Sequence, residues 1–372
     1  MSDKVRAALA AVVDGRTMTR DEARMAMGAV MDGEATPAQL GAFLVALRMR
    51  GETVEELAGF ASAMRERVLH VQAPVGTIDT CGTGGDGRGT FNISTAAALV
   101  AAAGGVPVAK HGNRAITSSS GSADVLEALG VPTDLGPDDA AEALREVGFA
   151  FLFAPGYSPA MRHAGPTRRE IGIRTAFNLL GPITNPAGAR RQLVGVADPG
   201  AARRLAEVLR ALGTERAMVV HGDRLDELPL DGTGVAYEVS ADGVVRHEVT
   251  PESVGLPWAS TEALAGGTPA ENAARMEALL AGERGPIRDA VLLNAGAAFV
   301  VAGRTDELRD GAELAAATID GGAAATLLAR LREQARRRTE GAAEGAPAGE
   351  NRAEAARTAG ARSGPTPARG AR

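Results

Sequence analysis

The sequence predicts an α/β fold in which a small all-helical N-terminal domain precedes a larger α/β domain with a mostly parallel central sheet. Two patterns indicate this class: residues 1–72 carry helix-start signals and apolar residues at helical spacing, and from Val75 short β runs alternate with helices. A third observation concerns the core. Hydrophobic residues make up 45% of the chain and aromatic ones 3%, which indicates a large aliphatic core.

The N-terminal helices are predicted from three capping signals of the form Thr-x-x-Glu/Gln, at Thr19–Glu22, Thr36–Gln39 and Thr53–Glu56. In each, the Thr hydroxyl can accept from a first-turn N–H while the Glu or Gln side chain reaches back to the cap. Pro37 stands at the first helical position, where its missing N–H costs nothing. Gly51 separates the second helix from the third.

The larger domain is predicted over residues 73–335. Alanine-rich helices at Ser94–Ala103 and Ala123–Leu129 separate the early β runs, and this alternation indicates a largely parallel sheet. The expected strands are Val75–Thr80, Val106–Lys110, Ala150–Phe153, Gln192–Ala197, Ala217–His221, Val235–Val239 and Val244–Val249. Residues 336–372 contain no apolar side chain larger than Ala, so they are predicted to be a disordered tail.

Composition narrows the class of function. The net charge is −6 and the tail is basic, so the body is more acidic than the whole chain, which argues against nucleic-acid partners. The single cysteine, Cys81, excludes an intrachain disulfide and favours a reducing compartment. The sequence shows neither a membrane-length apolar run nor a signal peptide at Met1–Lys4, so we expect a cytoplasmic protein without a membrane partner.

The most informative segment is the glycine loop of Asp79–Thr95, which follows a strand and leads into a helix. Its glycines allow the backbone to approach a ligand, and the helix N-terminus beyond it favours an anion. No Lys-Ser/Thr pair ends the loop, so it is not a P-loop. A dinucleotide fold would place an acid after the next strand, where Lys110 stands. Asp86 beside phosphates makes sense through a bridging cation or a sugar hydroxyl.

Two further motifs follow strands. Lys110–Ser122 offers cations and a row of hydroxyl donors that suit a diphosphate or a phosphate ester. His221–Glu227 ends in the adjacent carboxylates Asp226 and Glu227, a pattern that is more often a solvated turn. Because open α/β sheets bind ligands at the carboxyl ends of their strands, the pair can instead complete a Mg²⁺–diphosphate site.

Taken in order, these motifs resemble the anthranilate phosphoribosyltransferase family. The matching segments are Gly-Thr-Gly-Gly-Asp (82–86), Asn-Ile-Ser-Thr (92–95), Lys-His-Gly-Asn-Arg (110–114), Ser-Gly-Ser-Ala-Asp (120–124), Gly-Ile-Arg-Thr-x-Phe-Asn-Leu-Leu-Gly-Pro (172–182) and Leu-Asp-Glu (225–227). The resemblance runs from about residue 4 to about residue 335. It implies transfer of a phosphoribosyl group from phosphoribosyl diphosphate to the amine of anthranilate, a step of tryptophan biosynthesis.

The resemblance also assigns roles to matching residues. Two Mg²⁺ ions per active site would be held by Ser94 and by the pair Asp226 and Glu227. Lys110 would support the leaving diphosphate, and no single acid or base is implied. Substrate contacts would come from Gly82, Gly85, Asp86, Thr90, Asn92, Ile93, Ser94, Thr95, Lys110, His111, Gly112, Asn113, Arg114, Ala115, Ile116, Thr117, Ser118, Ser122 and Arg168. Among these, Asn113 and Arg168 would contact anthranilate, with Arg168 on its carboxylate.

The family fold implies that a later segment near residues 166–188 joins the helical domain and that the protein is a homodimer. The sequence differs from the usual family pattern at three positions, so the identity of the acceptor stays open. Ser158 stands where family members often have His, Ser119 where a basic residue is common, and Arg224 where Gly is usual. The alternatives are a phosphoribosyltransferase with another aromatic acceptor, a pyrimidine nucleoside phosphorylase, or a non-catalytic phosphoribosyl- or nucleic-acid-binding relative. A phosphorylase of that kind uses phosphate without a metal and would not need the acidic pair.

Overall fold

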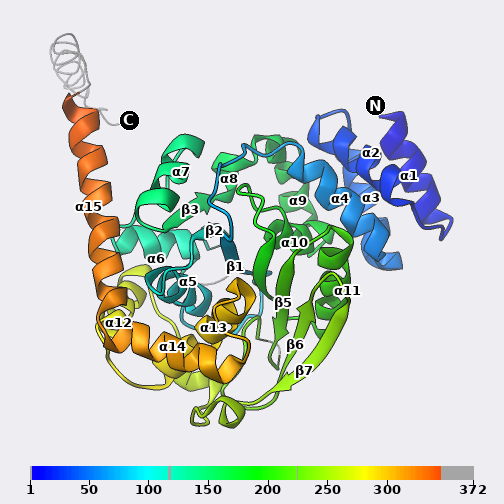
Figure 1. Ribbon diagram of the computed structural model, residues 1–372. Coiled ribbons are helices and arrows are strands. Elements are labelled where there is room, and N and C mark those ends of the chain that lie inside the picture. The colour runs from blue at the N-terminus through cyan, green and yellow to red at the C-terminus, as the bar shows by residue number, and fades with distance from the viewer. Residues whose placement is uncertain (1, 116–118, 224, 345–372) are drawn as a thin grey trace, which may run out of the picture. The chain divides into compact units, whose positions relative to one another are not determined.

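The computed structural model describes residues 2–115, 119–223 and 225–344. The chain divides into two compact units, Met1–Arg332 and Glu333–Arg372. The first unit contains the sheet and the helices that cover it (Figure 1).

The N-terminal helices are α1 (Asp3–Val13), α2 (Arg20–Met31), α3 (Pro37–Arg50) and α4 (Val54–Arg65). All three predicted capping boxes are confirmed, at the starts of α2, α3 and α4. The apolar faces of these helices form one hydrophobic cluster, in which the rings of Phe43 and Phe60 meet edge to face at 5.9 Å. Burial of these faces, more than helix propensity, stabilises helices of this length.

The central sheet has seven strands in the order β3-β2-β1-β4-β5-β6-β7. Strands β1 to β5 pair in parallel, and β6 and β7 continue the sheet in antiparallel pairing. The bounds are β1 (Ile78–Gly82), β2 (Val108–Gly112), β3 (Phe149–Phe153), β4 (Arg191–Gly195), β5 (Arg216–His221), β6 (Gly234–Val239) and β7 (Val244–Val249). Each of the seven predicted strands is confirmed, with ends that shift by up to three residues.

Helices cover both faces of the sheet, as α/β packing requires. On one face Ile78, Phe151 and Val220 belong to a cluster that includes α5, α6, α12, α13 and α14. On the other face Val194 and Val219 pack with α11, and Leu152 packs with α7. The helices are α5 (Ile93–Ala103), α6 (Ser122–Ala128), α7 (Pro137–Glu146), α11 (Pro199–Ala211), α12 (Pro269–Leu280), α13 (Pro286–Ala302), α14 (Leu308–Asp320) and α15 (Ala323–Glu344), with short 3₁₀ turns η3 (Glu252–Val254) and η4 (Thr261–Leu264).

The chain between β3 and β4 returns to the N-terminal helices through α8 (Ala154–Tyr157), η1 (Pro159–His163), α9 (Gly165–Ile171), α10 (Ala176–Leu180) and η2 (Gly181–Ile183). Phe177, Leu180 and Ile183 are buried in the same cluster as α2, α3 and α4. Arg65 of α4 donates from Nε to the carbonyl of Ile183 at 2.8 Å. The division of the first unit into domains at residues 72 and 73 stays a prediction.

The prediction of a disordered tail from residue 336 is wrong for its first nine residues, because α15 continues to Glu344, and residues 345–372 lie outside the described part of the chain. Arg337 pairs with Glu333 at 3.0 Å, and Arg336 lies 3.9 Å from Glu340. Arg, Glu and Ala are strong helix formers, and such i,i+4 pairs support a helix without any apolar burial.

Among the described residues no single helix is long and apolar enough to cross a membrane. The bent helix pair Leu308–Asp320 and Ala323–Glu340 would be long and apolar enough, by length and composition alone.

Candidate active site at the carboxyl edge of the sheet

Three loops meet where the central parallel strands end. Their described residues are 83–92 after β1, 113–115 and 119–121 after β2, and 222, 223 and 225–227 after β5. Parallel strands place their carboxyl ends at one edge of the sheet, so motifs that are far apart in the sequence become neighbours. Four residues singled out in the sequence lie outside the described part of the chain: the predicted site residues Ile116, Thr117 and Ser118, and Arg224, where Gly is usual in the family.

Strands β1 and β2 separate at this edge. The β1–β4 register runs from Ile78↔Arg191 to Gly82↔Gly195, whereas the register of β1 with β2 is one pair, Ile78↔Val108. Two side chains bridge the strands beyond it: Asp79 Oδ1 accepts from the His111 N–H at 3.1 Å, and Lys110 Nζ donates to the Thr80 carbonyl at 2.5 Å. The edge is therefore held by buried charged groups in place of ladder hydrogen bonds.

Lys110 is almost completely buried, and its ammonium also lies 3.4 Å from Ser94 Oγ. Burial lowers the pKa of Lys110, which the carboxylate of Asp79 opposes. Burial raises the pKa of Asp79 to about 6, despite hydrogen bonding and the nearby Lys110. Lys110 thus places one cationic group between the ends of β1, β2 and α5.

The adjacent carboxylates predicted to bind metal face the start of α5 and the glycine loop. Glu227 Oε1 accepts from the Ser94 N–H at 3.1 Å, and Asp226 Oδ2 accepts from the Gly84 N–H at 2.8 Å. Burial raises the pKa of both carboxyls; the charge of Asp86 adds to the rise for Asp226, and the charge of Asp226 adds to it for Glu227. Like charges held together out of water are stabilised by a bound cation.

The acidic pair therefore fits a divalent cation that brings further oxygen ligands with it. In the part of the chain that the structure describes, no group of three or more His, Cys, Asp or Glu side chains could hold a metal alone. Mg²⁺ typically uses one or two protein carboxylates and takes its remaining ligands from water and substrate phosphates.

Two glycines allow the acidic pair to lie against the strand ends. A Cβ at Gly82 would lie 2.3 Å from Asp226 Oδ2, and a Cβ at Gly195 would lie 1.6 Å from the backbone oxygen of Asp226. Both distances are far below contact, so any side chain at either position would displace Asp226. The close approach explains why glycine ends both β1 and β4.

The glycine loop is held by Arg174, which directly precedes Thr175, the N-cap of α10. Arg174 donates from Nη1 to the Gly84 carbonyl at 2.7 Å and from Nη2 to the Thr83 carbonyl at 3.3 Å. Gly85 has φ of +72°, and a Cβ there would lie 1.8 Å from Arg174 Nη1. Asp86 Oδ1 accepts from the Arg88 N–H at 3.2 Å, which tightens the turn after Gly85.

The second loop is tied to the glycine loop and to α6. Asn92 donates from Nδ2 to the Ser120 carbonyl at 3.1 Å. Asp124 Oδ2 accepts from the Ala115 and Gly121 N–H groups, each at 2.9 Å, so one carboxylate closes both ends of the loop.

Other residues predicted to bind substrate make contacts within the protein. Ser122 Oγ donates to the Asn113 carbonyl at 3.2 Å. The Arg114 guanidinium turns outward to Asp124 and Glu127, at 3.2 and 2.5 Å. The backbone of Thr90 bridges to Ala265, while the side chains of Ile93 and Thr95 are buried at 1% exposure. Their N–H groups donate to the carbonyls of Phe91 and Asn92, at 2.7 and 3.2 Å, so a contact of either residue with a ligand stays a prediction.

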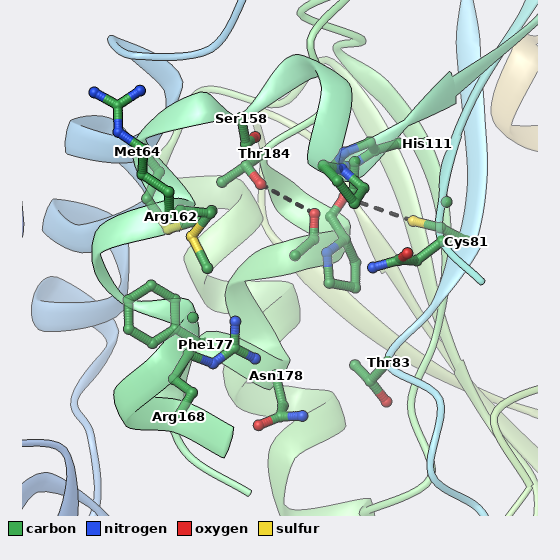
Figure 2. Close-up of a pocket in the computed structure, with 18 of the residues that line it drawn as sticks. Met64, Cys81, Thr83, His111, Ser158, Arg162, Arg168, Phe177, Asn178 and Thr184 are labelled. Atoms are coloured by element: carbon green, nitrogen blue, oxygen red, sulfur yellow. Dashed lines mark hydrogen bonds between the residues drawn. The ribbon is translucent and has the colours of Figure 1, made fainter. Parts of the chain in front are cut away.

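A cavity of about 840 Å³ lies beside these loops, between the ends of β1 and β2 and the segment containing α9 and α10 (Figure 2). Gly82, His111, Gly112, Asn113 and Arg168 line it, which brings together five of the predicted site residues. Figure 2 shows His111 and Cys81 on the strand side, with Arg168 and Phe177 across the cavity.

Two cavity residues have distinct electrostatics. The Arg168 guanidinium lies 4.7 Å from the centre of the Phe177 ring, and burial lowers its pKa. Burial lowers the pKa of His111 to about 4, so its imidazole is neutral at pH 7, and its Nε2 has no hydrogen-bond partner. A half-buried guanidinium stacked on an aromatic ring is suited to bind a planar carboxylate.

Sequence reasoning missed four residues that hold the site: Asp79, Arg174, Asn272 and Asn294. Asn272 of α12 donates from Nδ2 to Asn92 Oδ1 at 2.9 Å. The available signal for Asn294 was an amide inside the otherwise apolar run of residues 290–302, although that signal does not identify its partner. Arg174 lies within the Gly-Ile-Arg-Thr motif but had no role assigned to it.

Comparison with known proteins first shows the general class of enzyme to which the chain belongs. Residues 6–68 match the family model described as the helical bundle domain of a glycosyl transferase family, and residues 75–325 match the model of its a/b domain. The chain is thus a glycosyl transferase of this two-part kind.

Curated relatives and solved structures narrow the class. An anthranilate phosphoribosyltransferase from Phenylobacterium zucineum is 53% identical over 90% of this chain and 99% of its own, and one from Moorella thermoacetica is 54% identical over 87% and 96%. The crystal structure of the Thermus thermophilus enzyme has a TM-score of 0.85 at 49% identity, covering 88% of this chain and 99% of its own. The Saccharomyces cerevisiae enzyme in complex with PRPP and Mg has a TM-score of 0.83 at 25% identity, covering 91% and 99%. The chain belongs to the anthranilate phosphoribosyltransferase family, and the predicted resemblance and fold class are confirmed.

Proposed function

We propose that the chain transfers the phosphoribosyl group of 5-phosphoribosyl 1-diphosphate to the amine of anthranilate, with release of diphosphate, as a step of tryptophan biosynthesis. The observation that carries this proposal is the buried pair Asp226 and Glu227 set against Lys110, beside a cavity that contains a stacked arginine. Together they offer a cation–diphosphate site next to a carboxylate site.

The donor is proposed to lie along the three loops. Asp226, Glu227 and Ser94 would hold Mg²⁺, two ions per site, which when bound neutralise charge on the diphosphate. Lys110 would stabilise the leaving oxygens, because a buried ammonium interacts strongly with developing negative charge. The glycine loop supplies backbone N–H donors without a side chain in the way.

The acceptor is proposed to occupy the cavity. Arg168 would bind the carboxylate of anthranilate with its planar fork while its other face lies on Phe177. An aryl amine is neutral at pH 7, so its lone pair is free for attack and the site needs no general base. Asn113 and the neutral His111 line the same cavity and would orient the amine toward the ribose.

Ser158 leaves the acceptor's substituents open. Its side chain lines the cavity, so a second candidate function is phosphoribosyl transfer to a different aromatic acid. Arg168 favours a carboxylate in either case.

We further propose that the protein is cytoplasmic and that it forms a homodimer through its N-terminal helices. Val13, Met25 and Met49 lie on α1, α2 and α3 and are 68%, 48% and 84% exposed, which supports an apolar contact surface there. Light scattering on the purified protein tests the dimer, and a monomer at micromolar concentration would refute it.

A fluorescence assay tests the reaction. Purified protein, phosphoribosyl diphosphate and Mg²⁺ are mixed with anthranilate, and the loss of anthranilate emission is followed with EDTA as the control. The double variant Asp226→Asn/Glu227→Gln is expected to lower turnover by about a hundredfold or more. The exposed control Asp242→Asn/Glu283→Gln is expected to keep the wild-type rate.

The outcomes separate the possibilities. Mg²⁺-dependent loss of emission supports the proposed reaction. Donor binding by calorimetry without loss of emission would point to another acceptor. Wild-type turnover in the double variant at saturating Mg²⁺ would contradict the metal role of the acidic pair.

A further inference from the structure

Asn294 lies inside α13, has no exposed surface, and does not line the cavity. Its Oδ1 accepts from the Leu228 N–H at 3.0 Å, and its Nδ2 donates to the Leu228 carbonyl at 3.2 Å and to the Ala290 carbonyl at 2.9 Å. One amide therefore satisfies both backbone polar groups of Leu228, the residue directly after the acidic pair.

The loop that carries the acidic pair is fixed on each side. At its start the Gly222 N–H donates to the Leu225 carbonyl at 2.9 Å, which closes the turn. In its middle the Asp226 backbone rests on Gly195. At its end Asn294 holds Leu228, which is itself fully buried, so its N–H and C=O have no solvent to turn to.

Asparagine suits this position because its amide offers an acceptor and a donor to Leu228, as a residue of a neighbouring strand would, and a second donor to Ala290. Alanine would leave the buried N–H and C=O of Leu228 unsatisfied, and they could regain partners only if the loop moved. Movement at Leu228 would turn the carboxylates of Glu227 and Asp226 away from Ser94 and Gly84. Groups that orient metal ligands in this way typically change metal affinity by 10- to 100-fold.

We propose that Asn294 is a positioning residue for the acidic pair and sets the affinity of the site for its divalent cation. This rests on the proposed function only in that Asp226 and Glu227 bind a cation together with a diphosphate. Asn294 is fully buried and does not line the cavity, so it acts through Leu228.

The test measures cation binding directly. Mn²⁺ is titrated into the full-length protein in the presence of inorganic diphosphate, and free Mn²⁺ is followed by electron paramagnetic resonance relative to the same titration without protein, because diphosphate itself binds Mn²⁺. Asn294→Ala is expected to raise the Mn²⁺ dissociation constant about tenfold. Asn294→Ser keeps one hydroxyl that can accept from the Leu228 N–H, so its value is expected to fall between alanine and wild type, and it serves if the alanine variant does not fold.

The matched control is Thr318→Val on the neighbouring α14, which removes a buried hydroxyl that donates to the Leu314 carbonyl within its own helix at 2.8 Å. It is expected to lower the melting temperature without changing Mn²⁺ affinity. In steady-state assays Asn294→Ala is expected to raise the Mg²⁺ half-saturation concentration about tenfold while the KM for anthranilate stays within about twofold.

An Asn294→Ala protein that melts at lower temperature but binds Mn²⁺ as wild type does would overturn the proposal, and so would a wild-type protein that binds no Mn²⁺ with diphosphate. If Mn²⁺ binding weakens as expected but the wild type transfers no phosphoribosyl group to anthranilate, Asn294 keeps its role and the proposed function fails instead.

Discussion

The buried carboxyl group of Asp79 should make the stability of the protein depend on pH in a direction opposite to most carboxylates. It is fully buried, accepts from the His111 N–H, and has its pKa raised to about 6 by burial. We consider the substitution Asp79→Asn, which keeps an oxygen for the His111 N–H and removes the ionisation.

The sign follows from proton binding. Between pH 3.8, the ordinary pKa of an aspartate, and about 6, the folded protein holds a proton on Asp79 that the unfolded chain has released. Stability from this group is therefore full below pH 3.8 and is lost as the pH rises through 6. At about 1.4 kcal/mol per pH unit over roughly two units, wild type should lose about 3 kcal/mol relative to Asp79→Asn between pH 4 and pH 7.

The assay is guanidinium unfolding followed by circular dichroism at intervals from pH 4 to pH 7.5. The difference in unfolding free energy between wild type and Asp79→Asn removes contributions from other groups, including His111, whose lowered pKa acts in the opposite direction over a similar range. Asp242→Asn, in an exposed turn, is the control and should give a flat difference. A flat or oppositely sloping difference for Asp79→Asn would refute the reasoning.

Three further substitutions distinguish effects on donor binding from effects on acceptor binding. Arg174→Gln removes both hydrogen bonds to the glycine loop and should raise the KM for phosphoribosyl diphosphate about tenfold with little change for anthranilate; equal changes in both would contradict a role confined to the loop. Asn272→Ala removes the amide that holds Asn92 and should raise the donor KM severalfold and lower the melting temperature; an unchanged donor KM would leave it a purely structural residue. Arg168→Lys keeps the charge but loses the planar stack on Phe177, so the anthranilate KM should rise about tenfold while the donor KM stays unchanged. An unchanged anthranilate KM would show that Arg168 does not bind the carboxylate.

Local patterns in the sequence were enough to predict the strands, the caps and the loops that carry the site. The capping boxes at Thr19, Thr36 and Thr53 depend on residues three positions apart, so they can be recognised without the fold. Strand–helix alternation was enough to predict that Lys110 and the pair Asp226 and Glu227 lie at one edge of the sheet, because the connections of parallel sheets allow few topologies.

Features that depend on long-range packing could not be predicted. The separation of β1 from β2, with Asp79 and Lys110 bridging it, has no local signature. Asn294 meets Leu228 across 66 positions, and nothing near either residue marks the pairing. The prediction of a disordered tail was wrong for a different reason. It rested on the lack of large apolar side chains, whereas α15 continues to Glu344 on intrinsic helix propensity and i,i+4 ion pairs.

Gly195 illustrates how geometry will influence tolerance to mutation. It ends a central strand and contributes no functional group, yet even the methyl group of alanine would need the space that the Asp226 main chain occupies. In a library of all substitutions selected for growth without tryptophan, position 195 should therefore be depleted of every variant, as thoroughly as the carboxylates themselves. A measurement of protein abundance beside growth would separate variants that fold but lack a correctly placed Asp226 from variants that fail to accumulate.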